Sequence, residues 1–484
     1  MQNLKQKAIK GVYWNFINNL ASLGVQFIVG IILARILSPR EFGLVGMLTI
    51  FIAISQSFID SGFSSALIRK KDCKQTDYST VFYFNLGIGL FFYFILFISA
   101  NAISSFFNEP QLELILKVLG LGLVLNALSI IQSTILTKEI NFKTQTIITI
   151  LASIGSGGVA IVMALLNYGV WSLVALTTGR YALNTLFLWV LSKWRPTLVF
   201  SKKSFNELFS FGSKLLLSGL IETAYRNIYL LVIGKYFSAQ DLGFYTRADQ
   251  FQKLPSQTVL SVIQRVSYPV LSSFQNDNPV LKKNFRIIVR STMFIVFILL
   301  LGLAVVAKPL ILTLVGEKWL PSVIYLQLLC FVGVIYPINI LNLNILQVKG
   351  RSDVILRLEF IKKAIAIPII IIGIMVGIKA MIVGMIIEAF IQVFIHSYWS
   401  GKLIGYNFSA QIKDVLPSFL LAIVINGCVF LLGLLNLDSN FLMLSIQIVC
   451  GAILTILICE ITNFKDYKYL KTIIIQQLSR KAVK

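Results

Sequence analysis

Several basic residues lie inside long apolar stretches of this 484-residue sequence, where a charged side chain is costly. The candidates for a buried binding site are Arg180, Arg226, Arg247, Lys214, Lys253 and Arg265. A charge at the centre of a bilayer costs about 3 kcal/mol on the membrane-insertion scale, so such residues usually face water or a polar partner. Guanidinium groups bind phosphate oxygens through paired hydrogen bonds. These cations therefore predict a hydrated, basic cavity that binds an anion.

A polar stripe follows one of the helical segments that carry these cations. Its members are Lys214, Ser218, Glu222 and Arg226. They recur every four residues, and residues at this spacing lie on one face of a helix. Glu222 can pair with Arg226, which lowers the cost of both charges. The alternative for Lys214 is a position near the helix end, from which its side chain extends to the membrane surface.

A second pair of cations, Arg247 and Arg265, also shares a helix face. They are 18 residues apart, which is five turns at about 3.6 residues per turn. Pro255 lies between them, removes one backbone hydrogen bond and is expected to act as a hinge. Two alternatives stay open: Arg265 lies close to the cytoplasmic surface, and Lys253 pairs only with Asp249.

Neutral polar and acidic residues at membrane depth form a further group of candidates. They are Asn18, Gln26, Asp60, Glu222, Asp249 and Glu388. The carboxylates could relay protons or bind a coupling cation, Na+ or H+, and could equally be salt-bridge partners of the basic residues. We expect no other cofactor.

Metal binding and disulfide chemistry have little support in the sequence. The five cysteines show no CxxC spacing, and the single histidine, His396, lies in an apolar run. A metal cage needs several such ligands close together. We therefore expect no metal site and no histidine-based catalytic triad.

The elements that must position these residues are membrane-spanning helices. The chain is 57% hydrophobic and only 13% charged, whereas soluble domains have about 25% charged residues. Turn residues between the apolar runs predict an all-α protein of about fourteen transmembrane helices. The expected spans are 12–37, 41–68, 78–104, 112–136, 145–167, 169–193, 205–237, 241–271, 285–308, 322–348, 357–377, 379–401, 414–436 and 440–462.

The placement of positive charge predicts the orientation of the chain. With the N-terminus in the cytoplasm, about 30 of the 43 Lys and Arg residues fall in cytoplasmic segments and about four in outer turns, as the positive-inside rule requires. Both termini are then cytoplasmic. The net charge of +23 is thus explained by topology, and nucleic acid is not an expected partner.

One short stretch repeats after 200 residues. RILSPREFGLV at 35–45 aligns with KYFSAQDLGFY at 235–245. Six helices lie between the copies, so both have the same orientation, which is typical of parallel repeats around an axis along the membrane normal. We expect two six-helix lobes, 1–200 and 201–402, followed at 403–484 by a helix pair and a basic cytoplasmic tail.

A series of short motifs resembles a known family. The motifs are LSPREFGLV (37–45), DSGFSSALI (60–68), GVWSLVA (169–175), WRP (194–196), FGSKLLLSG (211–219), DLGFYTRADQF (241–251), LP (254–255), YPVLSSFQND (268–277), GEKW (316–319) and KGR (349–351). Over most of residues 1–360 the sequence resembles the polysaccharide transporters of the MOP flippase superfamily, in particular Wzx-type (WzxC-like) exporters. It departs from related lipid II flippases, which use arginines in the first helix, because this segment carries Asn15, Asn18, Asn19 and Gln26.

The resemblance implies a two-lobed flippase of the bacterial inner membrane. Such a protein moves undecaprenyl-diphosphate-linked oligosaccharide repeat units of lipopolysaccharide O-antigen, capsule or exopolysaccharide by alternating access through a basic central cavity. Its implied partners are the lipid-diphosphate-linked oligosaccharide and membrane lipids, with a glycan polymerase and glycosyltransferases of the same pathway as further candidates.

Two other functions fit the sequence less well. A MATE-like ion-coupled antiporter of small molecules or drugs usually carries cations, for which acidic residues would suit the cavity better. A membrane-embedded glycan polymerase or ligase would need a long external loop with catalytic residues, and all loops here are short. We therefore expect a transporter and not an enzyme.

Overall fold

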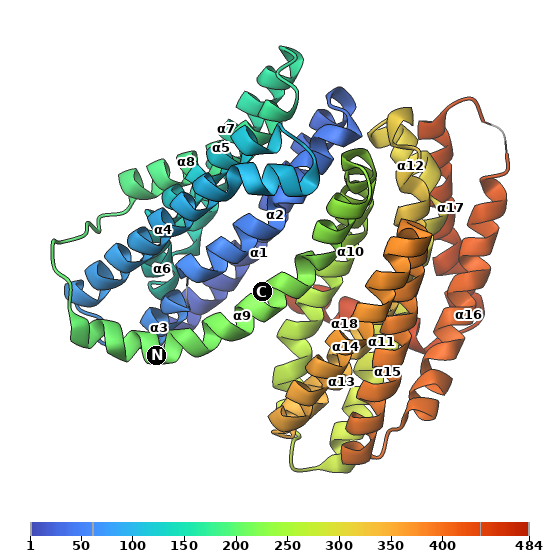
Figure 1. Ribbon diagram of the computed structural model, residues 1–484. Helices are drawn as coiled ribbons and strands as arrows, with labels where there is room; N and C mark the ends of the chain where they lie inside the picture. Colours follow the sequence, from blue (N-terminus) through green and yellow to red (C-terminus); the bar gives the residue numbers. More distant parts are fainter. Residues whose placement is uncertain (1, 61, 436, 483–484) are drawn as a thin grey trace. The chain divides into compact units, whose positions relative to one another are not determined.

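The computed structural model describes residues 2–60, 62–435 and 437–482 of the chain. These residues form α-helices, one short 3-10 helix and the turns between them (Figure 1). The chain forms two compact units, Met1–Thr246 and Arg247–Lys484. The boundary lies inside a single long helix, α10 (Ala239–Ser272).

The first unit contains nine helices in the described residues, together with the start of α10. They are α1 (Gln2–Ile36), α2 (Pro39–Asp60), α3 (Phe63–Arg69), α4 (Gln75–Phe107), α5 (Leu112–Ala127), α6 (Ile130–Lys138), α7 (Phe142–Leu165), α8 (Val170–Leu191) and α9 (Lys202–Tyr236) (Figure 1). Four helix pairs pack closely: α7 with α8, α4 with α5, α1 with α7 and α2 with α9. Phe63 of α3 is fully buried against Phe84 of α4 and Phe205 of α9, so aromatic packing joins these three helices.

The second unit contains most of α10 and the helices that follow it. They are α11 (Asn278–Val305), α12 (Ala307–Leu314), the 3-10 helix η1 (Glu317–Trp319), α13 (Ser322–Val348), α14 (Ser352–Val376), α15 (Ile378–Ile404), α16 (Phe408–Leu432), α17 (Asn440–Ile461) and α18 (Lys465–Ala482) (Figure 1). α13 packs on α15, and α11 packs on α13 and α16. Their buried faces form one apolar core, in which Phe285 meets Tyr406 edge to face.

The expectation of an all-helical, multi-pass membrane protein is confirmed. Among the described residues, ten helical segments are long and apolar enough to cross a membrane. Four other expected spans, 12–37, 169–193, 241–271 and 357–377, correspond to helices α1, α8, α10 and α14, which fall outside these ten. The count of fourteen spans therefore stays a prediction.

The two copies of the repeated stretch have the same local structure. At the start of α2, Ser38 donates from its backbone N (2.6 Å) and its Oγ (2.9 Å) to Oε2 of Glu41. At the start of α10, Ser238 donates in the same way to Oδ2 of Asp241, at 3.3 and 2.6 Å. In each case, the carboxylate three residues after the serine accepts a hydrogen bond from a backbone N–H that has no partner within the helix.

The repeated glycines then bring these two helix starts together. A Cβ on Gly43 would lie 1.6 Å from the carbonyl oxygen of Ala239, and a Cβ on Gly243 would lie 1.9 Å from that of Pro39. Each copy thus packs backbone against backbone on the other, in a reciprocal contact that only glycine permits. This contact supports a local two-fold relation between the copies.

The compact units and the expected lobes are different divisions of the chain. α9 lies in the first compact unit and packs on α2 and α3, whereas the repeat assigns α9 to the second lobe. A repeat describes which segments share an orientation, and compactness describes which segments touch. The lobes 1–200 and 201–402 therefore stay a prediction.

Candidate functional site: a polar cavity in the first unit

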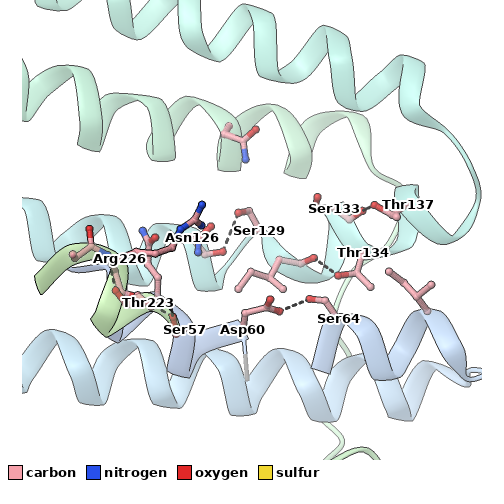
Figure 2. Close-up of a pocket in the computed structure, with 16 residues that line it drawn as sticks. Ser57, Asp60, Ser64, Asn126, Ser129, Ser133, Thr134, Thr137, Thr223 and Arg226 are labelled. Carbon is pink, nitrogen blue, oxygen red and sulfur yellow. Dashed lines mark hydrogen bonds between the residues drawn. The ribbon is translucent and has the colours of Figure 1, made fainter. Parts of the chain in front are cut away.

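A cavity of about 670 Å³ opens among helices of the first unit. Its lining residues are Ala53, Gln56, Ser57, Asp60, Ser64, Ile68, Asn126, Ser129, Ile130, Ser133, Thr134, Thr137, Asn184, Thr223, Arg226 and Asn227 (Figure 2). They come from α2, α3, α5, α6, α8 and α9. Most are hydroxyl or amide side chains, which is unusual for the interior of a protein so apolar overall.

A second cavity of about 520 Å³ adjoins the first and shares four lining residues with it. The shared residues are Asn126, Ser133, Thr137 and Asn184. The second cavity adds Asn18, Phe142, Gln145, Ile148, Thr149, Ala152, Arg180, Tyr181 and Leu188. Because four residues face both spaces, we treat them as two parts of one cavity, named here the polar cavity.

A break between α5 and α6 positions the amides and hydroxyls of this cavity. The carbonyl groups at the end of a helix lack partners within the helix. Here Thr185 of α8 donates to the carbonyl of Leu125 (2.7 Å), and Trp189 donates to the carbonyl of Leu128 (2.9 Å). These bonds fix α8 beside the break, and Asn184 of α8 reaches the same cavity as residues of α5 and α6.

The hydroxyl groups of α6 follow from its sequence. Ser129, Ser133 and Thr137 recur every four residues, as do Ile130 and Thr134, so the helix presents two adjacent rows to the cavity. A search of the sequence for charged residues does not reveal this row, because its members are uncharged. The four-residue spacing of hydroxyls was the signal that could have revealed it.

A second break, between α2 and α3, positions Asp60 and Ser64. Gly62 has a φ of +69°, and a Cβ there would lie 2.8 Å from the carbonyl oxygen of Gly212 in α9. Ser64 donates to Oδ1 of Asp60 at 2.6 Å, and both residues line the cavity (Figure 2). The close approach to α9 therefore requires glycine, and Asp60, the last residue of α2, contributes a carboxylate to the cavity.

Two arginines supply the positive charge of the polar cavity. Arg226 is 66% exposed, and its Nε lies 3.6 Å from Oε1 of Glu222. Arg180 lies 6.0 Å from the ring of Tyr181, whose hydroxyl accepts a hydrogen bond from Gln56. Among the side chains that the structure describes, no carboxylate pairs with Arg180. Both guanidinium groups line the cavity, and their role in binding stays a prediction.

Four predicted site residues line the polar cavity, and other predicted residues lie elsewhere. The four are Arg180, Arg226, Asn18 and Asp60. Lys214, Gln26 and Glu222 have exposed side chains and are not part of its lining. The side chain of Arg265 lies outside the described residues.

The predicted residues of the second unit have protein partners. Arg247 is buried, donates to Gln250 (2.8 Å) and lies 5.1 Å from the ring of Trp319. Lys253 pairs with Asp249 at 2.6 Å, the alternative considered from the sequence. Their roles in binding stay predictions.

Two further predicted residues of the second unit lie inside helices. Glu388 is buried in α15 and accepts a hydrogen bond from Gln392 at 2.8 Å. Pro255 lies within α10, which is helical on both sides of it. The coupling role of Glu388 and the hinge role of Pro255 also stay predictions. Within the described part of the chain, no three His, Cys, Asp or Glu side chains gather where a metal ion could bind.

The WRP motif has a structural role next to this site. The Arg195 guanidinium donates to the carbonyl oxygens of Ser192 (2.6 Å), Trp194 (2.8 Å) and Trp189 (2.5 Å). Basic side chains often satisfy the last carbonyls of a helix in this way. Trp194 in turn donates to Gln75 of α4 at 2.7 Å, so the motif ties the end of α8 to its neighbour.

Comparison with known proteins now identifies the family. A model of the polysaccharide biosynthesis protein family matches residues 32–324, more than half of the chain. The chain belongs to this family. The family found by the motif comparison is thereby confirmed, together with its assignment to polysaccharide biosynthesis and transport.

Two curated relatives illustrate the family. The chain is 24% identical to the teichuronic acid biosynthesis protein TuaB of Bacillus subtilis over 355 residues, which cover 73% of this chain and 74% of the relative. It is 27% identical to the lipopolysaccharide biosynthesis protein WzxC of Escherichia coli over 377 residues, which cover 77% and 76% of the two chains.

Solved structures show the same fold. The lipid II flippase MurJ in an inward closed conformation superimposes with a TM-score of 0.72 and 17% identity, covering 94% of this chain and 98% of MurJ. An inward-facing multidrug transporter of the MATE family gives a TM-score of 0.64 and 16% identity, covering 83% and 99%. The protein thus has a MurJ- and MATE-like transporter fold. Its membership in the polysaccharide biosynthesis family, and not the fold alone, supports the expected transporter.

Proposed function

We propose that the protein is a flippase that moves undecaprenyl-diphosphate-linked oligosaccharide repeat units across the bacterial inner membrane. The observation that carries the proposal is the polar cavity, with Arg180 and Arg226 in its lining, inside a polysaccharide biosynthesis transporter. A sugar diphosphate combines an anion with many hydroxyl groups. Guanidinium groups bind the diphosphate, and the neutral polar lining suits the sugar.

Alternating access is the transport mechanism that we propose. The lipid tail stays in the bilayer while the polar head enters the cavity, so the protein avoids moving a long apolar chain through water. In this mechanism the lobes 1–200 and 201–402 open the cavity to one side at a time, both termini lie in the cytoplasm, and 403–484 is an added helix pair and tail. A Na+ or H+ gradient drives the cycle. Glycosyltransferases assemble the repeat unit before transport, and a glycan polymerase acts on it afterwards.

The charge of the cavity argues against a MATE-like antiporter. Its described lining contains two arginines and one aspartate, a balance that favours an anionic cargo over a cationic one. The likeness to the MATE transporter, at 16% identity, concerns the fold alone. The anionic glycolipid is therefore the better-supported cargo.

Substitution of the cavity arginines tests this function. In a strain that lacks its own copy of the gene, Arg180→Ala and Arg226→Ala should each lower the amount of surface glycan by about tenfold or more, because a charged hydrogen bond contributes about 1.5–3 kcal/mol. Arg226→Lys should keep part of the activity, since it keeps the charge but loses the paired geometry. Surface glycan is measured by immunoblot, alongside the amount of protein in the membrane.

Lys203→Ala provides the matched control for this experiment. Lys203 is an exposed cation on the first turn of α9, the helix that carries Arg226, and it does not line the cavity. This variant should display normal amounts of glycan. Normal display by a double Arg180→Ala, Arg226→Ala variant would exclude an anion-binding role for the cavity.

A further inference from the structure

We propose that the polar cavity recognises the saccharide by accepting hydrogen bonds from sugar hydroxyls, and that only its two arginines contact the diphosphate. This inference rests on the proposed function and refines it. It assigns the two chemically different parts of the headgroup to different side chains. Its basis is the direction of the hydrogen bonds that the cavity residues already make.

Five cavity hydroxyls have given their single proton to the protein backbone. The acceptors are carbonyl oxygens three or four residues earlier in the same helical segment. The bonds are Ser57 to Ala53 (3.0 Å), Ser129 to Asn126 (2.9 Å), Thr134 to Ile130 (2.8 Å), Thr137 to Ser133 (3.0 Å) and Thr149 to Gln145 (2.8 Å). A hydroxyl has one donor and two acceptor lone pairs. Thr137 already accepts a hydrogen bond from Gln145, and Ser57 Oγ lies 3.1 Å from Thr223 Oγ1. Ser129, Thr134 and Thr149 accept from no other described residue, so their lone pairs are left for the cavity.

Asp60 and Ser64 strengthen this acceptor character. Ser64 gives its proton to Asp60 (Figure 2), and the exposed carboxylate of Asp60 has only acceptor oxygens. A diphosphate also has only acceptor oxygens at neutral pH. A diphosphate against this wall would leave its oxygens without donors and would be repelled by the carboxylate.

A saccharide has the complementary chemistry. Each sugar hydroxyl can donate one hydrogen bond to Ser, Thr or Asp oxygens and accept another. Asn126 and Asn184 face both parts of the cavity, and their side-chain amides make no hydrogen bond with other described residues. Each amide offers two donors and an acceptor, so each can bind two neighbouring sugar hydroxyls.

The size of the cavity agrees with a short oligosaccharide. Its two parts measure about 670 and 520 Å³, within the range of about 300–1,000 Å³ typical of small-ligand sites. Arg226 lines only the first part and Arg180 only the second. The hydroxyls and amides that line the two parts form the wall along which we place the sugar rings.

Two lipids distinguish sugar binding from phosphate binding. One is undecaprenyl diphosphate without sugar, and the other is the same lipid carrying the oligosaccharide made by the host strain. We would measure the affinity of the purified full-length protein in lipid nanodiscs for each. In the Thr134→Val, Thr149→Val double variant, affinity for the sugar-bearing lipid should fall by about tenfold, and affinity for undecaprenyl diphosphate should not change.

Three further variants interpret this result. Arg226→Gln should weaken binding of both lipids. Thr177→Val is the matched control, because its hydroxyl also donates to a carbonyl four residues earlier (Leu173, 3.0 Å) but does not line the cavity; it should change neither affinity. Thr134→Ser, Thr149→Ser restores both hydroxyls and should restore the affinity, which separates a lost acceptor from a misfolded protein.

The possible failures point to different errors. The valine double variant could lose affinity for both lipids equally, or bind the sugar-bearing lipid as tightly as the wild type does. Either result would mean that the assignment of the hydroxyls to sugar is wrong, while the flippase proposal stands. If the wild-type protein binds neither lipid, the proposed function itself is wrong.

Discussion

The surroundings of each arginine decide its role in this molecule. Arg180 and Arg226 line a cavity. Arg195 satisfies carbonyl groups at the end of α8. Arg247 is buried beside the ring of Trp319. The sequence placed Arg226 and Arg247 in one class because both interrupt apolar segments. The side chains that surround each arginine depend on helix packing, which the spacing of residues in one helix does not contain.

Arg247→Ala tests this distinction at the scale of the residue. Because Arg247 is 3% exposed and packs on Trp319, its loss should lower the free energy of unfolding by about 2 kcal/mol. The midpoint of thermal unfolding should fall together with glycan display. Arg226→Ala should reduce display without changing this midpoint, since Arg226 is largely exposed. An Arg247→Ala protein with normal unfolding but no transport would assign Arg247 to ligand binding.

At the scale of the element, several residues of the polar cavity lie next to the breaks between helices. The break before α6 and the break after α2 carry Ser129, Asp60 and Ser64 into the polar cavity. The sequence predicted each region as one span, 112–136 and 41–68, and each also corresponds to one candidate span of the structure, Leu112–Lys138 and Pro39–Arg69. Hydropathy is high throughout both regions, so it does not reveal a break. The hydrogen bonds from α8 that stabilise the first break come from residues 60 and 61 positions away.

The reciprocal glycine contact gives a prediction for helix packing. Gly43→Ala or Gly243→Ala would place a methyl group within 2 Å of a backbone carbonyl oxygen, so α2 and α10 must separate. Such overpacking costs about 1–3 kcal/mol, and the midpoint of thermal unfolding should fall. In Gly219→Ala in α9, the added Cβ meets nothing within 4 Å, so the midpoint of thermal unfolding should be no lower than that of the wild type. Unchanged midpoints for the first two variants would mean that the helix starts are not in contact.

At the scale of the whole molecule, the fold was more predictable than the site. Apolar run length and turn residues yield a helical membrane protein because the bilayer requires both. Arg180 and Arg226, two of the predicted binding residues, line the polar cavity, and their role in binding stays a prediction. The neutral lining of Asn126, Asn184 and the hydroxyls of α6 was not predicted, because counting charges along the chain gives no weight to uncharged residues that come together only in three dimensions.

The orientation of the whole chain is testable with reporter fusions. Lys and Arg are concentrated in the segments assigned to the cytoplasm, and moving such segments across the membrane is unfavourable. Alkaline phosphatase, which is active only outside the cytoplasm, should be inactive when fused after Lys484 and active when fused after Asn167, in the turn between α7 and α8. A green fluorescent protein, which fluoresces only inside, should give the opposite pattern. Phosphatase activity at Lys484 would place the C-terminus outside and would require an odd number of spans if the N-terminus is cytoplasmic.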